Sequence, residues 1–90
     1  MTATLHWLRN SSLLPWLQQH SHLLGDDDAL LLSGEALKEL SVTKHSIQQP
    51  IFAREREVEI LNTTVPDYVM LKSDSEWVEL VLSFPQQITW

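Results

Sequence analysis

Short runs of apolar residues recur along the chain and predict its strands. Thr4–Leu8 is typical of a short first strand. Ala29–Leu32 is a continuous apolar run, the pattern of a strand covered on both faces in a parallel sheet. Two later runs, Pro50–Ala53 and Asp67–Lys72, predict a third and a fourth strand. We therefore expect these segments to lie inside one sheet with helices on both faces.

Apolar residues at helical spacing lie between these runs. In the first helix, four residues recur at helical spacing: Leu13, Leu17, His20 and Leu24. Gly25 follows it and is expected to be the C-cap of this helix. Two shorter helical segments are predicted further along the chain, over residues 35–40 and 55–61.

The segment Asp74–Phe84 fits two patterns. As a strand, its alternate apolar residues would share one face, whereas as a helix its acidic residues would share a solvated face. Ser73 is followed three residues later by Glu76, which is the pattern of a capping box. Pro85 would end a helix at the preceding residue. These two signals favour the helix.

The predicted order of elements is β-α-β-α-β-α-β-α. Such alternation is typical of parallel sheets, because a parallel connection has to return to the end of the sheet from which it started. At 90 residues the chain has room for one domain. We therefore expect residues 1–90 to form a single α/β domain, with three layers (α/β/α) around a mainly parallel, four-stranded sheet.

The composition narrows the range of functions. Cys is absent, which excludes disulfides, cysteine-ligated metals and a cysteine nucleophile within this chain and makes the cytoplasm the expected location. No membrane span and no secretory signal are predicted. The net charge is −6, and nucleic-acid binders normally carry a basic stripe, so we expect no direct RNA or DNA binding by the isolated chain. The six bases are scattered: Arg9, Lys38, Lys44, Arg54, Arg56 and Lys72.

The candidate metal and catalytic residues do not form a recognisable site. His20 and His22 are two positions apart on the predicted helix and point in different directions, so we expect a half-buried His20 and an exposed His22. His6 and His45 have no partner visible in the sequence. Asp26–Asp28 lacks the further ligands of a calcium loop and is interpreted as a solvated turn. Phosphate-loop and nucleophile-elbow motifs are absent, and we expect no catalytic residue, no metal and no cofactor.

The last residues form an apolar tail. Ile88 and Trp90 are disfavoured in water, so we expect the tail to pack either on this domain or on a partner subunit. An aromatic residue seated in a groove is common at interfaces. Trp16 and Trp77 lie on apolar helix faces and are expected in the core. The residues that we assign to an interface are Trp77, Pro85, Gln86, Gln87, Ile88 and Trp90.

The stretch from Trp77 to Trp90 resembles the end of the TusB/DsrH family. Members of that family close with an aromatic-Val-x-Leu segment, then Pro-Gln-Gln and a final Trp, and this chain has WVEL, PQQ and Trp90 in that order. The segment between Leu40 and Thr64 departs from the family pattern and is shorter. Segments similar to the first four strands of the family occur in order at Thr4–His6, Ala29–Gly34, Pro50–Ile51 and Asp67–Leu71.

The resemblance implies a DsrE/DsrH-like fold and a role in sulfur relay. TusB assembles with the similar subunits TusC and TusD into a heterohexamer that relays persulfide sulfur toward 2-thiouridine at the wobble position of certain tRNAs. DsrH is the counterpart in sulfur-oxidising organisms. Some DsrH members carry a cysteine in the first helix, where this chain has Leu17–His20. The chain would therefore be a non-catalytic subunit that holds cysteine-bearing TusC- and TusD-like partners.

Two alternatives remain open at this point. The first is a sulfurtransferase-like enzyme that works without cysteine, which is chemically weak because the thiolate is the usual carrier of the sulfur. The second is a free-standing α/β adaptor with an unrelated partner. Assembly with TusC- and TusD-like subunits separates the sulfur-relay role from the adaptor.

Overall fold

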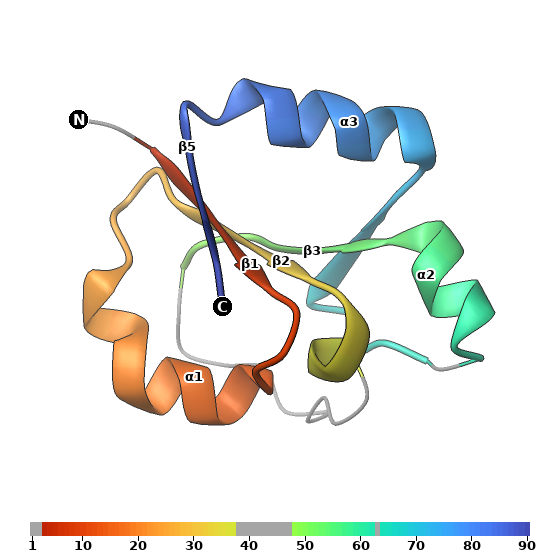
Figure 1. The fold of residues 1–90 in the computed structure, drawn as a ribbon, viewed down its shortest axis with the longest axis horizontal. Coiled ribbons are helices and arrows are strands. Elements are labelled where there is room, and N and C mark those ends of the chain that lie inside the picture. Colours follow the sequence, from red (N-terminus) through yellow and green to blue (C-terminus); the bar gives the residue numbers. More distant parts are fainter. Residues whose placement is uncertain (1–2, 38–47, 63) are drawn as a thin grey trace.

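The computed structural model describes residues 3–37, 48–62 and 64–90. These residues form a five-stranded sheet in the order β4-β3-β2-β1-β5, and every neighbouring pair of strands is parallel (Figure 1). The expected α/β class and the parallel sheet are confirmed. The elements are β1 (Thr4–Leu8), α1 (Leu13–His20), the 3₁₀ turn η1 (Ser21–Leu23), β2 (Ala29–Leu32), the 3₁₀ turn η2 (Gly34–Leu37), β3 (Ile51–Arg54), α2 (Glu55–Ile60), β4 (Val69–Lys72), α3 (Asp74–Ser83) and β5 (Gln86–Thr89).

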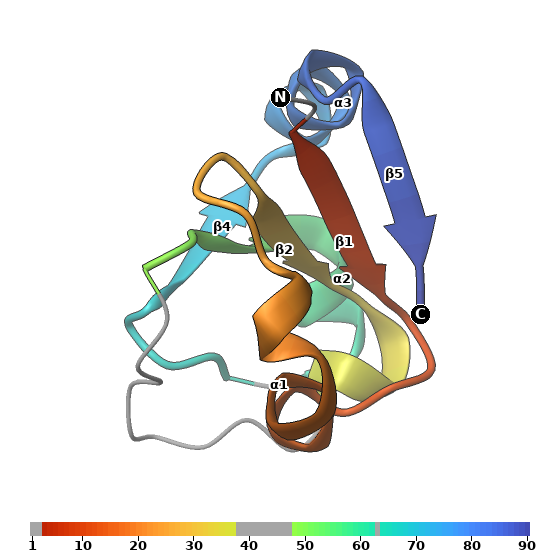
Figure 2. The same ribbon diagram turned by 90° about the vertical axis from the view of Figure 1, so that its left-hand side faces the viewer.

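The central strand β2 is buried on both faces, as its apolar run predicts. Successive residues of a strand point to opposite faces. Leu30 and Leu32 therefore pack with α1 and η2, whereas Ala29 and Leu31 pack with the residues of α3. Because α1 and α3 cover opposite faces, the described residues form three layers (Figures 1 and 2).

The helix α3 connects the two edges of the sheet. It follows β4 at one edge and leads into β5, which pairs with β1 at the other (Figure 2). At its start, the hydroxyl of Ser73 accepts a hydrogen bond from the N–H of Glu76 (3.3 Å), and the Glu76 carboxylate accepts one from the N–H of Ser73 (3.0 Å). The helix ends at Ser83, before Pro85. The capping box and the helix are thus confirmed, and the strand interpretation of this segment is wrong.

The expected number of four strands is wrong, because Gln86–Thr89 forms a fifth. All four side chains of this edge strand are exposed. Its sequence therefore lacks the alternation of apolar and polar residues from which a half-buried strand is predicted. The pairing with β1 uses backbone groups, which do not depend on the side chains. The strands β3 and β4 also begin slightly later than expected, at Ile51 and Val69.

Two predicted helices are shorter than expected. α1 ends at His20, and Gly25 is not its C-cap, because Gly25 lacks the left-handed backbone of such a cap. The N–H of Gly25 instead donates to the carboxylate of Asp28 at 2.9 Å. The predicted helix over 35–40 is the short turn η2, and residues 38–40 lie outside the described residues, as does His45. The segment after β3 is helical as predicted.

We expect Ser73→Ala to lower the free energy of unfolding by about 1 kcal/mol, because the N–H of Glu76 loses its capping acceptor. Urea unfolding followed by circular dichroism measures the change. Ser83→Ala is the control, since the Ser83 hydroxyl only donates to the Leu80 carbonyl within the helix, and this variant should lose less than about 0.5 kcal/mol. Equal losses in the two variants would contradict a stabilising capping box.

Candidate functional site

The tail docks on its own domain through Trp90. The backbone N–H of Trp90 donates to the carbonyl of Trp7 at 2.8 Å. The carbonyl of Trp90 accepts from the N–H groups of Arg9 and Asn10, each at 3.1 Å. Its indole ring is half-buried and packs on the face of the sheet that α1 covers. The ring centroids that surround it are those of His20 (4.7 Å), Trp16 (5.5 Å) and His6 (6.3 Å).

A buried chain of hydrogen bonds joins Trp90 to the start of the sheet. His6, in β1, is 2% exposed. Its Nδ1 accepts a hydrogen bond from Nε1 of Trp90 (3.2 Å), and its Nε2 lies 3.1 Å from Oδ2 of Asp28. Because an indole nitrogen can only donate, Nδ1 of His6 carries no proton, and the proton on Nε2 is donated to Asp28. The two neighbours thus fix one neutral tautomer of the His6 ring.

Asp28 holds three segments of the chain together. Its Oδ1 accepts from the N–H of Thr4 (2.9 Å), and its Oδ2 accepts from the N–H of Gly25 (2.9 Å) and from His6. Burial raises the pKa of Asp28, but these three hydrogen bonds outweigh burial and hold the pKa below its ordinary value. The two preceding aspartates are exposed as expected, whereas the interpretation of Asp28 as part of a solvated turn is wrong.

The His6–Asp28 pair is not arranged as a general base. Both ring nitrogens of His6 are engaged, so the ring can accept a proton from a substrate only by releasing Trp90. Among the described residues, no three His, Asp or Glu side chains are placed to hold a metal ion. His20 is half-buried and His22 is exposed, as predicted. The arrangement therefore serves to join segments of the chain.

The residues assigned to an interface lie in three places. Trp77 is on the α3 side of the sheet, with its ring centroid 5.5 Å from that of Trp7. Trp90 is on the α1 side, so the structure does not bring these two tryptophans together. The remaining four residues are exposed along the turn after α3 and the edge strand β5: Pro85, Gln86, Gln87 and Ile88.

A shallow surface pocket of about 270 Å³ borders Trp90. It opens beside the first turns of α1, so one side of the docked tail faces the surface. The other residues that line the pocket are Ser11, Ser12, Pro15, Trp16, Gln19 and His20.

The pairing of His6 with Asp28 was missed in the sequence, although one signal for it exists. His6 lies between Leu5 and Trp7 in a predicted strand, and an imidazole that is buried needs hydrogen-bond partners. The partner could not be named, because Asp28 is 22 positions away and is one of three consecutive aspartates.

The chain is thus a small α/β protein with a parallel sheet. Its edge strand β5 ends at Trp90, and the Trp90 ring is hydrogen-bonded to the buried pair of His6 and Asp28. No protein-family model matches the chain, and a search of curated proteins found no match. Within the described ranges, no helix has the length and apolar character needed to cross a membrane.

Asp28→Asn should lower the free energy of unfolding at neutral pH by about 1–3 kcal/mol, because the new NH₂ group faces donors that now bind the carboxylate. The pKa of Asp28 is lowered in the folded chain, so its ionisation stabilises the fold above the unfolded-state pKa. This stabilisation is lost as the pH falls through the folded-state pKa. Urea unfolding in steps from neutral pH to about pH 2 should therefore show the difference between the two proteins shrinking as the pH falls below the unfolded-state pKa.

Asp27→Asn, in the exposed part of the same turn, is the control for Asp28→Asn and should behave like the wild type. A constant gap between Asp28→Asn and the wild type at every pH would show that ionisation of Asp28 contributes nothing to stability.

Trp90→Ala should lower the free energy of unfolding by about 2 kcal/mol, less than a fully buried tryptophan, because the ring is half-buried. Trp90→Phe keeps a ring but loses the donor to His6, and should lose about 1 kcal/mol. Leu82→Ala is the control, since Leu82 is 79% exposed. Unfolding in urea measures all three, and an unchanged Trp90→Ala would show that the docked tail does not stabilise the domain.

Proposed function

We propose that this chain is a non-catalytic subunit of a sulfur-relay complex that supports 2-thiolation of the wobble uridine in certain tRNAs. It binds cysteine-bearing TusC- and TusD-like subunits and holds them in place. The observation that carries the proposal is the stretch from Trp77 to Trp90, which resembles the end of the TusB/DsrH family and leaves apolar side chains exposed at one edge of the sheet.

The chemistry of the chain supports a holding role. A relay carries sulfur as a persulfide on a thiolate, and the chain contains no cysteine. The buried histidine has both nitrogens engaged in the contact with the tail, so it is not available to activate a sulfur donor. In this proposal, all covalent sulfur chemistry belongs to the partner subunits.

The surface near the tail supports a protein partner. Val78 and Leu82 are one turn apart on α3 and both are exposed, and Ile88 on β5 is also exposed. On its outer side β5 has no neighbour among the described strands, and an open strand edge is suited to contact with another chain. Exposed apolar side chains and an open strand edge are two features that an interface can use, and here both belong to the stretch that resembles the family.

The finer fold assignment and the location are part of the same proposal: the chain is a DsrE/DsrH-like domain that works in the cytoplasm.

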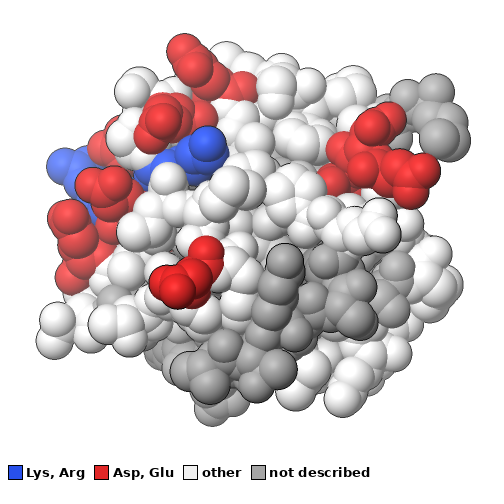
Figure 3. All heavy atoms as spheres, turned by 180° about the vertical axis from the view of Figure 1, so that it is seen from behind, with Lys and Arg blue, Asp and Glu red and all other residues white. Residues whose placement is uncertain are grey.

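The arrangement of the charges supports recruitment of tRNA by the partners rather than by this chain. Arg54 and Arg56 both contact Asp74, at 3.1 and 3.3 Å. On the face shown in Figure 3, the basic side chains lie in one area among acidic ones and form no stripe for a phosphate backbone.

The test is assembly with TusC- and TusD-like subunits after co-expression, measured by native pull-down and size-exclusion chromatography. We expect the wild-type chain to join the complex and Leu82→Asp to weaken its binding at least about tenfold, because a charge is placed in an apolar contact. Ile60→Asp is the matched control, since Ile60 is 74% exposed but lies on α2, outside the stretch that resembles the family.

Equal binding of the two aspartate variants would show that the α3 surface is not the interface. Failure of the wild-type chain to join the complex would contradict the proposal and favour the adaptor with an unrelated partner. With labelled cysteine and a cysteine desulfurase, label should appear on the partner subunits and not on this chain. Stable covalent label on this chain would contradict a purely holding role.

A further inference from the structure

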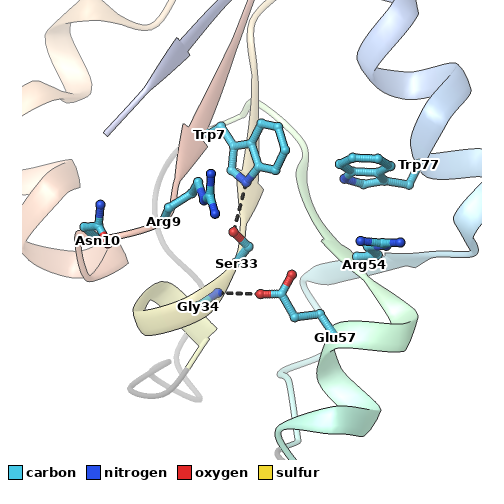
Figure 4. Close-up of a pocket in the computed structure, with 8 residues that line it drawn as sticks. All are labelled: Trp7, Arg9, Asn10, Ser33, Gly34, Arg54, Glu57 and Trp77. Atoms are coloured by element: carbon cyan, nitrogen blue, oxygen red, sulfur yellow. Dashed lines mark hydrogen bonds between the residues drawn. The ribbon is translucent and has the colours of Figure 1, made fainter.

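A second pocket, called the hollow below, has a volume of about 430 Å³. It is lined by Trp7 and Trp77, which lie on the face of the sheet that α3 covers, whereas Trp90 packs on the opposite face (Figure 4). The hollow lies outside the carboxyl ends of β1, β2 and β3. Its volume is within the range of small-molecule sites. The residues that line it are Trp7, Arg9, Asn10, Ser33, Gly34, Arg54, Glu57 and Trp77.

Two arginines line this hollow: Arg9 follows the end of β1, and Arg54 is the last residue of β3. The guanidinium of Arg54 lies 4.8 Å from the ring centroid of Trp77, and its Nε donates to Asp74 at 3.1 Å, which fixes the plane of the group. The guanidinium of Arg9 lies 5.5 Å from the ring centroid of Trp7, and no acidic residue of the described ranges is within ion-pair distance of it. In Figure 4, Arg9 and Arg54 lie on opposite sides of Ser33.

The hollow presents one further hydrogen-bond donor, Ser33, and one N–H group that is already engaged, that of Gly34. The buried Oγ of Ser33 accepts from Nε1 of Trp7 at 2.9 Å, so its own proton remains free to be donated. The N–H of Gly34 donates to the carboxylate of Glu57 at 2.6 Å. Gly34 has φ +58°, and a Cβ there would lie 3.0 Å from the carbonyl oxygen of Arg9, so glycine allows the two loops to approach.

We propose that this hollow binds a small oxyanion, such as phosphate, either free or as the anionic group of a small molecule. Arg9 and Arg54 supply the charge, and Ser33 donates a hydrogen bond between them. The Glu57 carboxylate already occupies the N–H of Gly34 and opposes a second anion, so it limits the affinity. This inference does not depend on the sulfur-relay proposal, because Arg9, Arg54 and Ser33 carry none of the argument for that proposal, although Trp77 lines the hollow.

The test is a titration of the full-length, ¹⁵N-labelled chain with inorganic phosphate at constant ionic strength, followed through the indole N–H signals. The signals of Trp7 and Trp77 should shift and saturate, whereas those of Trp16 and Trp90, on the other face, should not. Adenosine monophosphate is the second ligand, and tighter binding than phosphate would show that the anion is recognised as part of a larger molecule. Similar binding of the two would favour a free anion.

Four variants distinguish a specific phosphate-binding site from a general effect of the net charge on phosphate binding. Arg9→Gln and Arg54→Gln should each weaken phosphate binding at least tenfold. Glu57→Gln should strengthen phosphate binding severalfold, because it removes a negative charge. The side-chain carbonyl of the new glutamine can still accept the hydrogen bond from the N–H of Gly34. Arg56→Gln makes the same change of charge on a side chain that also contacts Asp74 but does not line the hollow, and it should change binding less than twofold. Circular dichroism confirms that each variant is folded.

Three results would overturn the proposal. The first is the absence of any saturable shift with either ligand. The second is an equal effect of Arg54→Gln and Arg56→Gln, which would indicate a general effect of net charge. The third is a shift of all four indole signals together. Arg9 is exposed, so Arg9→Gln provides the test even if Arg54→Gln does not fold.

Discussion

The outer edge of the sheet depends on the hydrogen bonds that join Asp28, His6 and Trp90. All side chains of β5 are exposed, so the strand gains little from apolar burial and is held by its backbone pairing with β1 and by Trp90 at its end. Trp90 in turn needs an acceptor at Nδ1 of His6. Asp28 supplies that acceptor indirectly, because it accepts a hydrogen bond from Nε2–H of His6 and so favours the tautomer in which Nδ1 carries no proton.

The strand β1 connects the two candidate sites through adjacent residues. His6 points to the α1 face and contacts Trp90, whereas the next residue, Trp7, points to the α3 face and lines the hollow with the two arginines. The carbonyl of Trp7 also accepts the N–H of Trp90. The anion site and the docked tail are therefore built on one strand and share a residue, although they lie on opposite faces of the sheet.

The parts of the fold that follow from local physics could be predicted from the sequence. Ala29–Leu32 was identified as a strand buried on both faces because all four residues are apolar, and α3 was identified by the capping box of Ser73 and Glu76. The fifth strand could not be predicted, because Gln86–Thr89 is paired through its backbone and its side chains follow no buried pattern. Gly25 was misassigned, since the side chain of Asp28, and not a left-handed turn, satisfies its N–H.

The candidate sites were harder to predict, because they join residues that are far apart in the sequence. His6 and Trp90 are 84 positions apart, and Arg9 and Arg54 showed only as two of six scattered bases. Such distant contacts also affect the order of folding, since closing a long loop is slow and local contacts form first. Without β5, β1 would be an unpaired edge that can accept a strand from another molecule. A strand that comes from the far end of the described chain and pairs through its backbone is therefore an element that two copies of the chain can exchange.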